Sequence, residues 1–426
     1  MVSASKRIFL VSAWLLFGGL SFWGGFLVEL YKLWPEPFLV RVQRVPVSLW
    51  KFGTIAPDNL IVSPPKSASR ERFVVHDRSR RMNGYYGLLG WDDERGTYSA
   101  WLYRTDGQLL HTWNLNYWAL DPDGPRNRGD APHAFWILPD GSFMVSFDWG
   151  DVMARVDPCG QPTWTKTGTY HHSLEPADDG TFWTWRGDGS SHGHRQFMVN
   201  FDPATGNTLR EIELADVIRK AGPLAITFGV PADFQFRDAT ADGQVSDIFH
   251  PNDVEALRAT EAGMFPQFET GDLLISLREV NLVAVIDPHD LSVKWQQQGP
   301  WRWQHDPDFA GDGTISVFNN NEGRDRSEIV KIHPSSTGQI SNELHDGGVS
   351  FYTASMGTHQ YLPNGNVFLV VPDEGRVLEL GPNGREVVEF NNVFRPAPAY
   401  NAHVANGMWL PEGYFSTLPS CATGSR

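Results

Sequence analysis

Short apolar segments alternate with turns rich in glycine, aspartate and asparagine along the chain from about residue 85 onward. Apolar or alternating runs of roughly four to eight residues, bounded by such turns, are typical of β-strands. No long stretch has a convincing helical period, and the best helical candidate is Leu214 to Ala221. The pattern predicts an all-β fold, which the 41 glycines and 29 prolines suit because such folds need many tight turns.

A histidine stands eight residues before a glycine that opens a strand in three segments: 133–141 (HAFWILPDG), 172–180 (HSLEPADDG) and 305–313 (HDPDFAGDG). A fourth unit begins at His250, where an insertion displaces the glycine to Gly271. A turn resembling I-D-P follows the glycine by sixteen residues at Asp157 and again at Asp287. Each unit therefore reads as strand, strand, turn and strand, and the connection to the next histidine supplies an outer strand.

Five such units begin near the following residues: His133, His172, His250, His305 and Thr358. A sixth unit, 85–113, lacks its opening strand, and the segment 403–415 near the end of the chain offers one. Four-stranded units with a period of roughly 40 to 50 residues indicate a β-propeller. We expect six blades, closed by strands from both ends of the chain. A count of seven, using part of the insertion 208–249, is the alternative.

The first residues differ from the rest. Between residues 8 and 31 the only charge is Glu29, and 24 residues at about 1.5 Å each can cross a membrane. No cleavage site follows, so we expect an uncleaved signal anchor, a single transmembrane helix. The predicted division is a cytoplasmic tail (1–7), the anchor (8–31), a connector (32–84), the propeller (85–416) and a C-terminal tail (417–426). The propeller would lie on the extracytoplasmic side, the periplasm in a Gram-negative source.

The net charge is −15, from 50 acidic and 35 basic residues. An acidic surface without a basic run repels nucleic acid, which excludes it as an expected partner. There are two cysteines, Cys159 and Cys421. An oxidising compartment would permit a bridge between them, and two free thiols agree with the sequence equally well.

The repeated histidines are the candidate chemistry. The innermost strand of a propeller blade begins near the central channel, so His133, His172, His250 and His305 are expected to face one axis. Alternatively, the histidine could have a structural role and hydrogen-bond a turn in every unit. The fifth unit, however, has Gly357 or Thr358 at the position of the histidine. Arg278 interrupts an apolar strand, where a guanidinium needs an anion, either a tetrahedral oxyanion or a carboxylate such as Glu279 or Asp253.

Several segments together resemble the bacterial arylsulfotransferase (arylsulfate sulfotransferase) family: YRTDGQLLHTW, HPND, DLLISLREVNLVAVIDP, QHDPDFAGDGTISVFNNNEG and GTHQYLPNGNVFLV. The resemblance spans most of residues 85–392 and is strongest from His250 onward. It implies a six-bladed propeller that moves a sulfuryl group from a phenolic sulfate ester to a phenol without a nucleotide donor. The implied partners are small aryl sulfates and phenols, with no cofactor and no metal.

The resemblance also assigns roles. It implies that His305 is the nucleophile, that His250 is a second catalytic residue beside Asn252, and that Arg278 is catalytic. A further histidine falls on His171 or His172, of which His172 fits the repeat better, and a hydroxyl near the sulfate falls on Thr358.

The chemistry suits these residue types. Imidazole can accept a sulfuryl group as sulfohistidine, Arg278 and His172 can hold the sulfate oxygens, and His250 can serve as acid and base. Trp301, Trp303 and Tyr352 are candidates to stack on the phenol.

Two other functions compete with this one. The propeller could be catalytically silent, a membrane-anchored subunit or interaction scaffold of a membrane complex. It could also use the same histidines as a metal or redox centre, with His192 and His194 as further ligands, although their spacing matches no defined site. His133 lacks distinctive neighbours and is expected to be structural.

Overall fold

The computed structural model describes residues 71–122, 124, 131–147, 150–188, 195–230, 248–334, 340–342, 348–396 and 400–421, together with Phe17 and Ser21. The chain divides into two units, residues 1–60 and 61–426, and the propeller lies in the second. The predicted anchor 8–31, apart from Phe17 and Ser21, lies outside the described residues, as does the connector up to residue 70. In the part that is described, no helix is long and apolar enough to cross a membrane.

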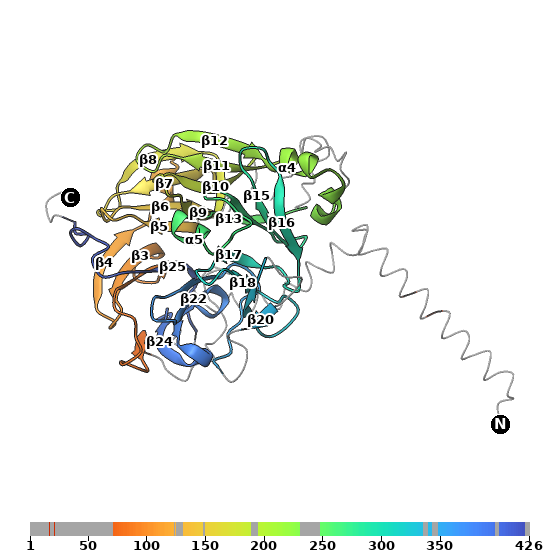
Figure 1. Cartoon of the computed structure of the whole chain (residues 1–426). Helices are drawn as coiled ribbons and strands as arrows, with labels where there is room; N and C mark the ends of the chain where they lie inside the picture. Colours follow the sequence, from red (N-terminus) through yellow and green to blue (C-terminus); the bar gives the residue numbers. More distant parts are fainter. Residues whose placement is uncertain are drawn as a thin grey trace, which may run out of the picture. The chain divides into compact units, whose positions relative to one another are not determined.

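Six antiparallel sheets make up the described part of the second unit (Figure 1), and we number them as blades in chain order. Blade 1 comprises β25 (Val404–Leu410), β2 (Tyr85–Asp92), β3 (Thr97–Arg104) and β4 (Leu109–Asn114); blade 2 comprises β5 (Pro132–Ile137), β6 (Phe143–Phe147), β7 (Val152–Val156) and β8 (Pro162–Thr167). Blade 3 comprises β9 (Thr169–Pro176), β10 (Phe182–Gly187), β11 (Gln196–Phe201) and β12 (Thr208–Glu213); blade 4 comprises β13 (Pro251–Ala256), β14 (Leu273–Leu277), β15 (Leu282–Ile286) and β16 (Val293–Gln298). Blade 5 comprises β17 (His305–Phe309), β18 (Ile315–Asn319), β19 (Glu328–Ile332) and β20 (Ile340–Asn342); blade 6 comprises β21 (Thr358–Tyr361), β22 (Val367–Val371), β23 (Arg376–Leu380) and β24 (Glu386–Asn391), followed by β1 (Phe73–Val75).

The prediction of an all-β, six-bladed propeller is confirmed. The insertion that could have supplied a seventh blade contains instead, in its described residues beyond β12, the helix α4 (Leu214–Ala221) and a 3₁₀ helix (Gly222–Phe228). The predicted helical segment therefore agrees with α4 at both ends. The remaining short helices are α3 (Tyr117–Leu120), α5 (Ala259–Ala262) and two 3₁₀ turns (Pro372–Glu374 and Pro382–Gly384).

Strands from both ends of the chain close the ring, as predicted. β25 pairs with β2, in a register that runs from Tyr85 opposite Leu410 to Gly90 opposite Val404. One boundary differs from the expectation, because β1 joins the outer edge of blade 6 by pairing with β24. Residues 73–75 of the expected connector thus belong to the propeller. A short outer strand of this kind covers an edge that would otherwise be open.

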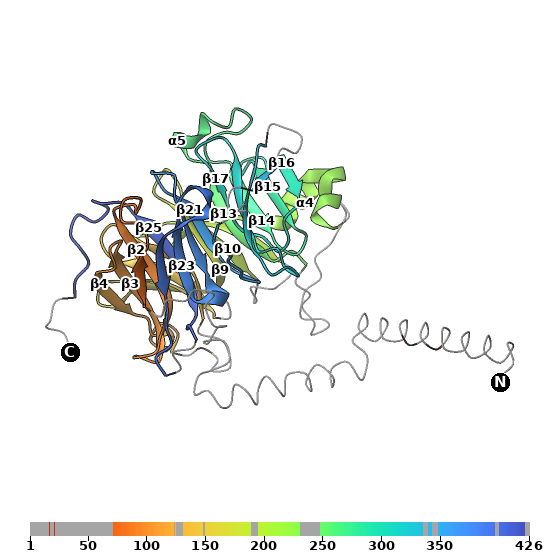
Figure 2. The same ribbon diagram turned by 90° about the horizontal axis from the view of Figure 1, so that it is seen from below.

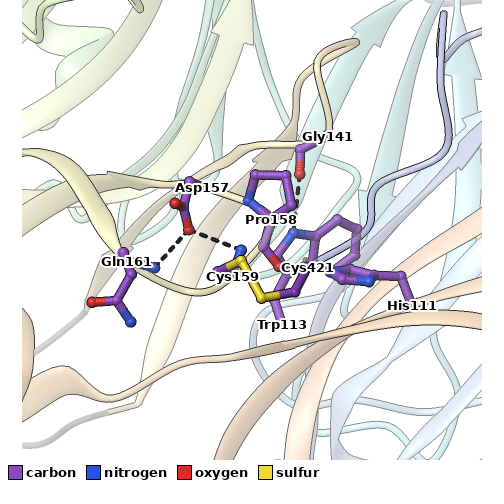
Figure 3. The surroundings of a disulfide bond; sticks show 8 residues. All are labelled: His111, Trp113, Gly141, Asp157, Pro158, Cys159, Gln161 and Cys421. Atoms are coloured by element: carbon purple, nitrogen blue, oxygen red, sulfur yellow. Dashed lines mark hydrogen bonds between the residues drawn. A yellow bond between two sulfur atoms is a disulfide. The ribbon is translucent and has the colours of Figure 1, made fainter. Parts of the chain in front are cut away.

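A disulfide between Cys159 and Cys421 reinforces this closure (Figure 3). Cys159 lies in the turn after β7 of blade 2, and Cys421 follows β25 of blade 1, 262 residues away in the chain. Nearby, the Trp113 indole donates to the carbonyl oxygen of Gly141 at 3.0 Å. The alternative of two free thiols is excluded in this structure, and the last described residues of the tail are tied to the neighbouring blade.

The core lies between the faces of neighbouring blades, which stand side by side around the axis (Figures 1 and 2). The middle strands β14 and β15 are buried throughout, because a blade lies against each of their faces. This explains why the sequence of these strands is continuously apolar rather than alternating. Between blades 3 and 4, buried Trp185 packs in the same cluster as Leu273 and Ile275. Outer strands such as β8 and β16 are only partly buried.

Candidate active site

The first strands of the six blades contact one another in a ring around the axis. Five of them, β5, β9, β13, β17 and β25, lose their regular register beside the residue that the repeat aligns. The exception is β21, which begins with Thr358 and keeps its register. Bulges re-aim side chains and are common next to active sites. In this propeller, irregular inner strands coincide with the histidine positions.

Backbone strain accompanies these bulges. His172, His250 and Asp306 have positive φ values of 66°, 45° and 50°. Residues other than glycine seldom adopt this conformation, and it persists where surrounding structure enforces it, often at active sites. The bulges and this strain lie where the repeated histidines meet.

A cavity of about 320 Å³ opens along the axis. Its wall includes His133, His172, His305, Asn252 and Thr358 among the residues named from the sequence. The pocket is therefore shared by all six first strands, because β25 contributes its own residues as well. His171, His250 and Arg278 are not part of the wall.

His172 is at the centre of the histidine cluster. Its ring centroid lies 4.2 Å from that of His133, 4.8 Å from that of His250 and 6.4 Å from that of His305. His133, expected to be structural, thus joins the group. His403 stands directly before β25 and is a further member that the sequence reading did not single out, although its place at the start of the closing strand was a signal. Burial and the nearby charge of His133 lower the pKa of His403 to about 4.

A chain of hydrogen bonds links three of these rings. His171 Nε2 lies 2.9 Å from Gln196 Oε1, His171 Nδ1 lies 2.6 Å from His172 Nδ1, and His172 Nε2 lies 3.0 Å from His250 Nε2. Because an amide oxygen only accepts, neutral His171 carries its proton on Nε2 and accepts from His172. Neutral His172 then accepts from Nε2–H of His250. This explains the adjacent pair: His172 lines the cavity, while His171 supports it from behind.

The groups that hold the His305 ring lie in or next to blade 5. Its Nδ1 lies 2.7 Å from Asn320 Oδ1 and 3.1 Å from the carbonyl oxygen of Trp303. Asn320 is fully buried, and its amide nitrogen donates to the carbonyl oxygens of Thr353 (3.0 Å) and Met356 (2.7 Å). These contacts fix the amide orientation, so Nδ1 of His305 carries the proton and Nε2 the lone pair. The backbone N–H of Met356 donates to that Nε2 at 3.2 Å.

Burial is the main reason that the pKa of His305 is well below its ordinary value, and the charge of Arg278 is the second. Burial likewise lowers the pKa of His172 well below 6.5, with the neighbouring histidines adding to the effect. Desolvation disfavours the charged form of imidazole. Both rings are therefore neutral at neutral pH, which is the nucleophilic state of imidazole.

Arg278 lies next to the cluster, directly after β14. Its backbone N–H donates to the carbonyl oxygen of His250 at 3.1 Å, and its guanidinium lies 4.6 Å from the ring of Trp303. The guanidinium also pairs with Glu279 at 2.6 Å. The carboxylate alternative considered for this arginine is thus present, through Glu279 and not through Asp253. The guanidinium thus contacts both the Glu279 carboxylate and the Trp303 ring.

Asn252 and Thr358 lie in the cavity wall. The amide nitrogen of Asn252 donates to the carbonyl oxygen of Gln304 at 2.7 Å, which joins blades 4 and 5 beside His305. Gln304 itself donates to groups of blade 4, including Ser276 Oγ at 3.1 Å. Gln304 therefore fixes the backbone directly before His305, and its side chain does not line the cavity.

The aromatic residues proposed for stacking do not line this cavity. Trp301 is buried in the core, Trp303 contacts Arg278, and Tyr352 is only partly buried and absent from the wall. Aromatic side chains from the first strands and their ends line it instead: Phe135, Trp136, Phe309 and Tyr361.

Carboxylates line the remainder of the cavity: Glu261 of α5, and five residues of the first strands, Glu175, Asp253, Glu255, Asp306 and Asp308. We call these five residues the acidic wall. The sequence reading missed them as a group, but a signal existed. Each follows an axial histidine by one to five residues in the motifs HSLE, HPNDVE and HDPD.

Two groups of side chains in the described residues could bring three donor atoms to one cation: Asp306, Asp308 and His359, and His76, Glu386 and Glu389. Both ring nitrogens of His359 are already within hydrogen-bond distance of protein groups, Asp306 Oδ2 at 2.8 Å and Ser316 Oγ at 2.9 Å. This arrangement favours a protein hydrogen-bond network over a metal ion. His192 and His194, the extra ligands of the metal hypothesis, lie outside the described residues.

A family model described as arylsulfotransferase (ASST) matches residues 136–393, which is more than half of the chain. The matched range contains all seven site residues predicted from the sequence, from His171 to Thr358. The comparison with curated proteins finds no match.

Solved structures resemble the fold only distantly. A protein of unknown function from Bacteroides caccae aligns with a TM-score of 0.48 and 11% identity, over 76% of this chain and 98% of that one. The WD40 β-propeller domain of Doa1 gives 0.39 and 11%, over 77% and 84%. Virginiamycin B lyase from Staphylococcus aureus gives 0.37 and 13%, over 65% and 74%. At such identities only the fold is comparable.

Proposed function

Because the chain belongs to the arylsulfotransferase family, we propose that it transfers a sulfuryl group from a phenolic sulfate ester to a phenol, through a sulfohistidine at His305 and without a nucleotide donor. Sulfotransferase activity in general follows from the family. The observation that carries the specific proposal is the hydrogen bond of 2.7 Å between His305 Nδ1 and Asn320, which leaves the lone pair on Nε2. For attack, this lone pair gives up the hydrogen bond of 3.2 Å from the backbone N–H of Met356.

In the first half-reaction, Nε2 of His305 attacks the sulfur of the donor ester. The bond between sulfur and the aryl oxygen breaks, its electron pair stays on that oxygen, and the phenolate takes a proton. We assign the delivery of this proton, which enters from solvent, to the His172–His250 pair, because the two Nε2 atoms lie 3.0 Å apart and His172 lines the cavity. The product is a sulfoimidazolium whose Nδ1–H still bonds to Asn320.

The second half-reaction reverses these steps with a new phenol. The acceptor hydroxyl returns a proton to the histidine pair, its oxygen attacks sulfur, and the bond to Nε2 breaks. One acid–base pair thus serves both directions, as microscopic reversibility requires. Transfer of a sulfuryl group resembles phosphoryl transfer, in which positioning and charge stabilisation dominate. Arg278 is suited to hold the sulfate oxygens, whereas both ring nitrogens of His172 are already engaged by His171 and His250. Thr358 and Asn252 are suited to limit the orientation of the sulfate.

The test uses the purified full chain with para-nitrophenyl sulfate and a phenol acceptor, and no nucleotide. We expect a burst of para-nitrophenol, sulfation of the acceptor, and mass-spectrometric detection of a sulfuryl group on the peptide that contains His305. His305→Ala should abolish all three, while His289→Ala, a change of an exposed histidine, should alter none. No product over a broad donor panel, or full activity in His305→Ala, would refute the proposal and return the silent scaffold as the better explanation.

We also propose that residues 8–31 anchor the propeller on the extracytoplasmic side of a membrane. The long apolar run with Glu29 as its single charge supports this, and the Cys159–Cys421 disulfide is of the kind found in oxidising compartments. In a Gram-negative host the full chain should fractionate with membranes, and deletion of residues 1–31 should release it. Recovery of the full chain in the soluble fraction would refute the anchor.

A further inference from the structure

The central cavity has two chemically different parts. The histidines lie where the first strands begin, and the acidic wall follows them along β9, β13 and β17. Glu175 comes three residues after His172, Asp253 and Glu255 come three and five after His250, and Asp306 and Asp308 follow His305. Equivalent positions of three adjacent blades therefore direct five carboxylates to one space.

These carboxylates have too few positive partners. Among the described residues, Arg258 is the only lysine or arginine that lines the cavity. His359 lies 2.8 Å from Asp306 and 3.5 Å from Asp308, so it can balance at most one charge between them. Glu255 receives one backbone N–H, from Phe309 at 2.9 Å. Buried carboxylates are ordinarily paired with a cation, because an unpaired charge is costly to desolvate.

The pKa directions agree with this charge imbalance. Burial is the first cause that raises the pKa of Glu175 to about 8, and the Asp306 carboxylate is the second. Burial and mutual repulsion also raise the pKa of Asp253, Glu255 and Asp308 well above their ordinary values. A cation in this part of the cavity would favour the ionised forms of all four groups.

A second observation is independent of the carboxylates. Asn252 is 4% exposed and lines the same cavity, between the histidines and the acidic wall. Its amide nitrogen donates to Gln304, but its Oδ1 accepts no hydrogen bond from any described residue. A buried acceptor without a donor is rare and needs an explanation. Like the carboxylates, this oxygen calls for a ligand that donates hydrogen bonds.

We infer that the acidic wall is a subsite for a positively charged group of the substrate, and that the preferred acceptor is a phenol bearing an alkylammonium group. An ammonium offers three donors and no acceptor, which matches carboxylates and the Asn252 oxygen. Aromatic side chains in the wall, among them Trp136, supply faces for the phenol ring and for the cation. A cavity of about 320 Å³ lies at the lower end of the range for small-molecule sites, roughly 300–1,000 Å³.

This inference rests on the proposed function, and it also removes a difficulty of that function. A donor that carries only a sulfate is repelled by the ionised groups of the acidic wall, whereas a neutral or cationic acceptor is not. The sulfuryl group is then expected on the side of His250 and Arg278, and the substituent of the acceptor on the acidic side. A divalent metal ion is the other ligand that carboxylates attract, and it forms an outcome of the test.

The test compares tyramine with para-ethylphenol, which has a similar shape but no charge, as acceptors for the sulfuryl group of para-nitrophenyl sulfate. We expect kcat/KM to favour tyramine by at least about tenfold at neutral pH, since one desolvated charge pair is worth that much. Glu175→Gln and Glu255→Gln should each reduce this ratio, and the double variant should reduce it further. Glu412→Gln, a change of an exposed residue outside the cavity, should leave the ratio unchanged.

Failure of the two proposals can be told apart. Equal kcat/KM values for the two acceptors in an active enzyme overturn the cationic subsite alone. If neither acceptor is sulfated, the proposed function fails, and calorimetry of tyramine and para-ethylphenol with the His305→Ala variant decides the subsite. Binding of tyramine alone supports it, and equal or absent binding of both overturns it. Binding of Mg²⁺ or Ca²⁺ that excludes tyramine also overturns it.

Discussion

Replacement of Asn320 tests the reasoning about the nucleophile most directly. Asn320→Ala removes the acceptor that holds His305 Nδ1–H at 2.7 Å and the two donations to the carbonyl oxygens of Thr353 and Met356. The ring then loses its fixed tautomer and orientation, although the nucleophile itself remains. By analogy with other groups that orient a catalytic histidine, we expect kcat to fall by about a hundredfold or more.

The same change also affects stability. A buried hydrogen-bonded group costs about 1–3 kcal/mol when a partner is left unsatisfied, and two carbonyl oxygens lose their donor. We expect the free energy of unfolding to decrease by about 2–4 kcal/mol. Asn200→Ala is the matched control, because Asn200 is also a buried asparagine, 8% exposed, whose amide bonds to Thr181 and Phe182 far from the cavity. It should lower stability and leave kcat unchanged.

The assay is para-nitrophenol release as a function of pH, with thermal denaturation in parallel. Asn320→Asp adds a sharper measurement, since a carboxylate beside Nδ1 favours the imidazolium. The pKa of His305 should rise, so the acid limb of the activity profile should move to higher pH than in the unaltered protein. If Asn320→Ala keeps kcat within about threefold, or if Asn320→Asp leaves the acid limb in place, then Asn320 does not orient the nucleophile.

Three further predictions follow from the site and the fold. Because burial depresses the pKa of His172 and His305 in the folded protein, their contribution to stability should fall as pH drops below about 6.5, whereas the raised pKa of Glu175, Asp253, Glu255 and Asp308 acts in the opposite direction. Chemical denaturation of the unaltered protein and of His305→Ala at several pH values isolates the histidine contribution, and identical pH profiles of the two proteins contradict it. Cys159→Ser should lower the free energy of unfolding by about 2–4 kcal/mol, because the bond to Cys421 spans 262 residues. Reduction of the unaltered protein should produce the same loss. If the melting temperature changes in neither case, the disulfide has no structural role. Arg278→Met should lower kcat/KM for the anionic donor by at least about tenfold, through loss of a guanidinium beside the sulfate; an unchanged rate in donor-dependent kinetics would remove this arginine from the site.

The blade pattern was readable from the sequence because it depends on local periodicity. Strand length, turn residues and the eight-residue spacing repeat in each unit, and each reflects the burial of a short strand between two faces. The same logic located α4 to the residue and identified 403–415 as the closing strand. It placed His133, His172, His250 and His305 at one axis, where the structure also has them.

The details of the site were not readable in that way. The sequence reading set His133 apart as structural, yet its ring is the nearest of the cluster to that of His172. Asn320 and Gln196 were missed because they reach the histidines from other strands, with no spacing that connects them. The bulges and positive φ values that turn His172 and His250 also leave no mark in the hydrophobic pattern.

The sequence alone determined the all-β class, the six blades and their closure, since each depends on interactions repeated within every unit. Only the tertiary structure decided which nitrogen of His305 carries the proton, that His250 contacts His172 outside the cavity wall, and that Cys159 meets Cys421. It also decided that five carboxylates face one cavity. These properties arise from contacts between blades, and such contacts depend on how the ring closes rather than on any single segment of the chain.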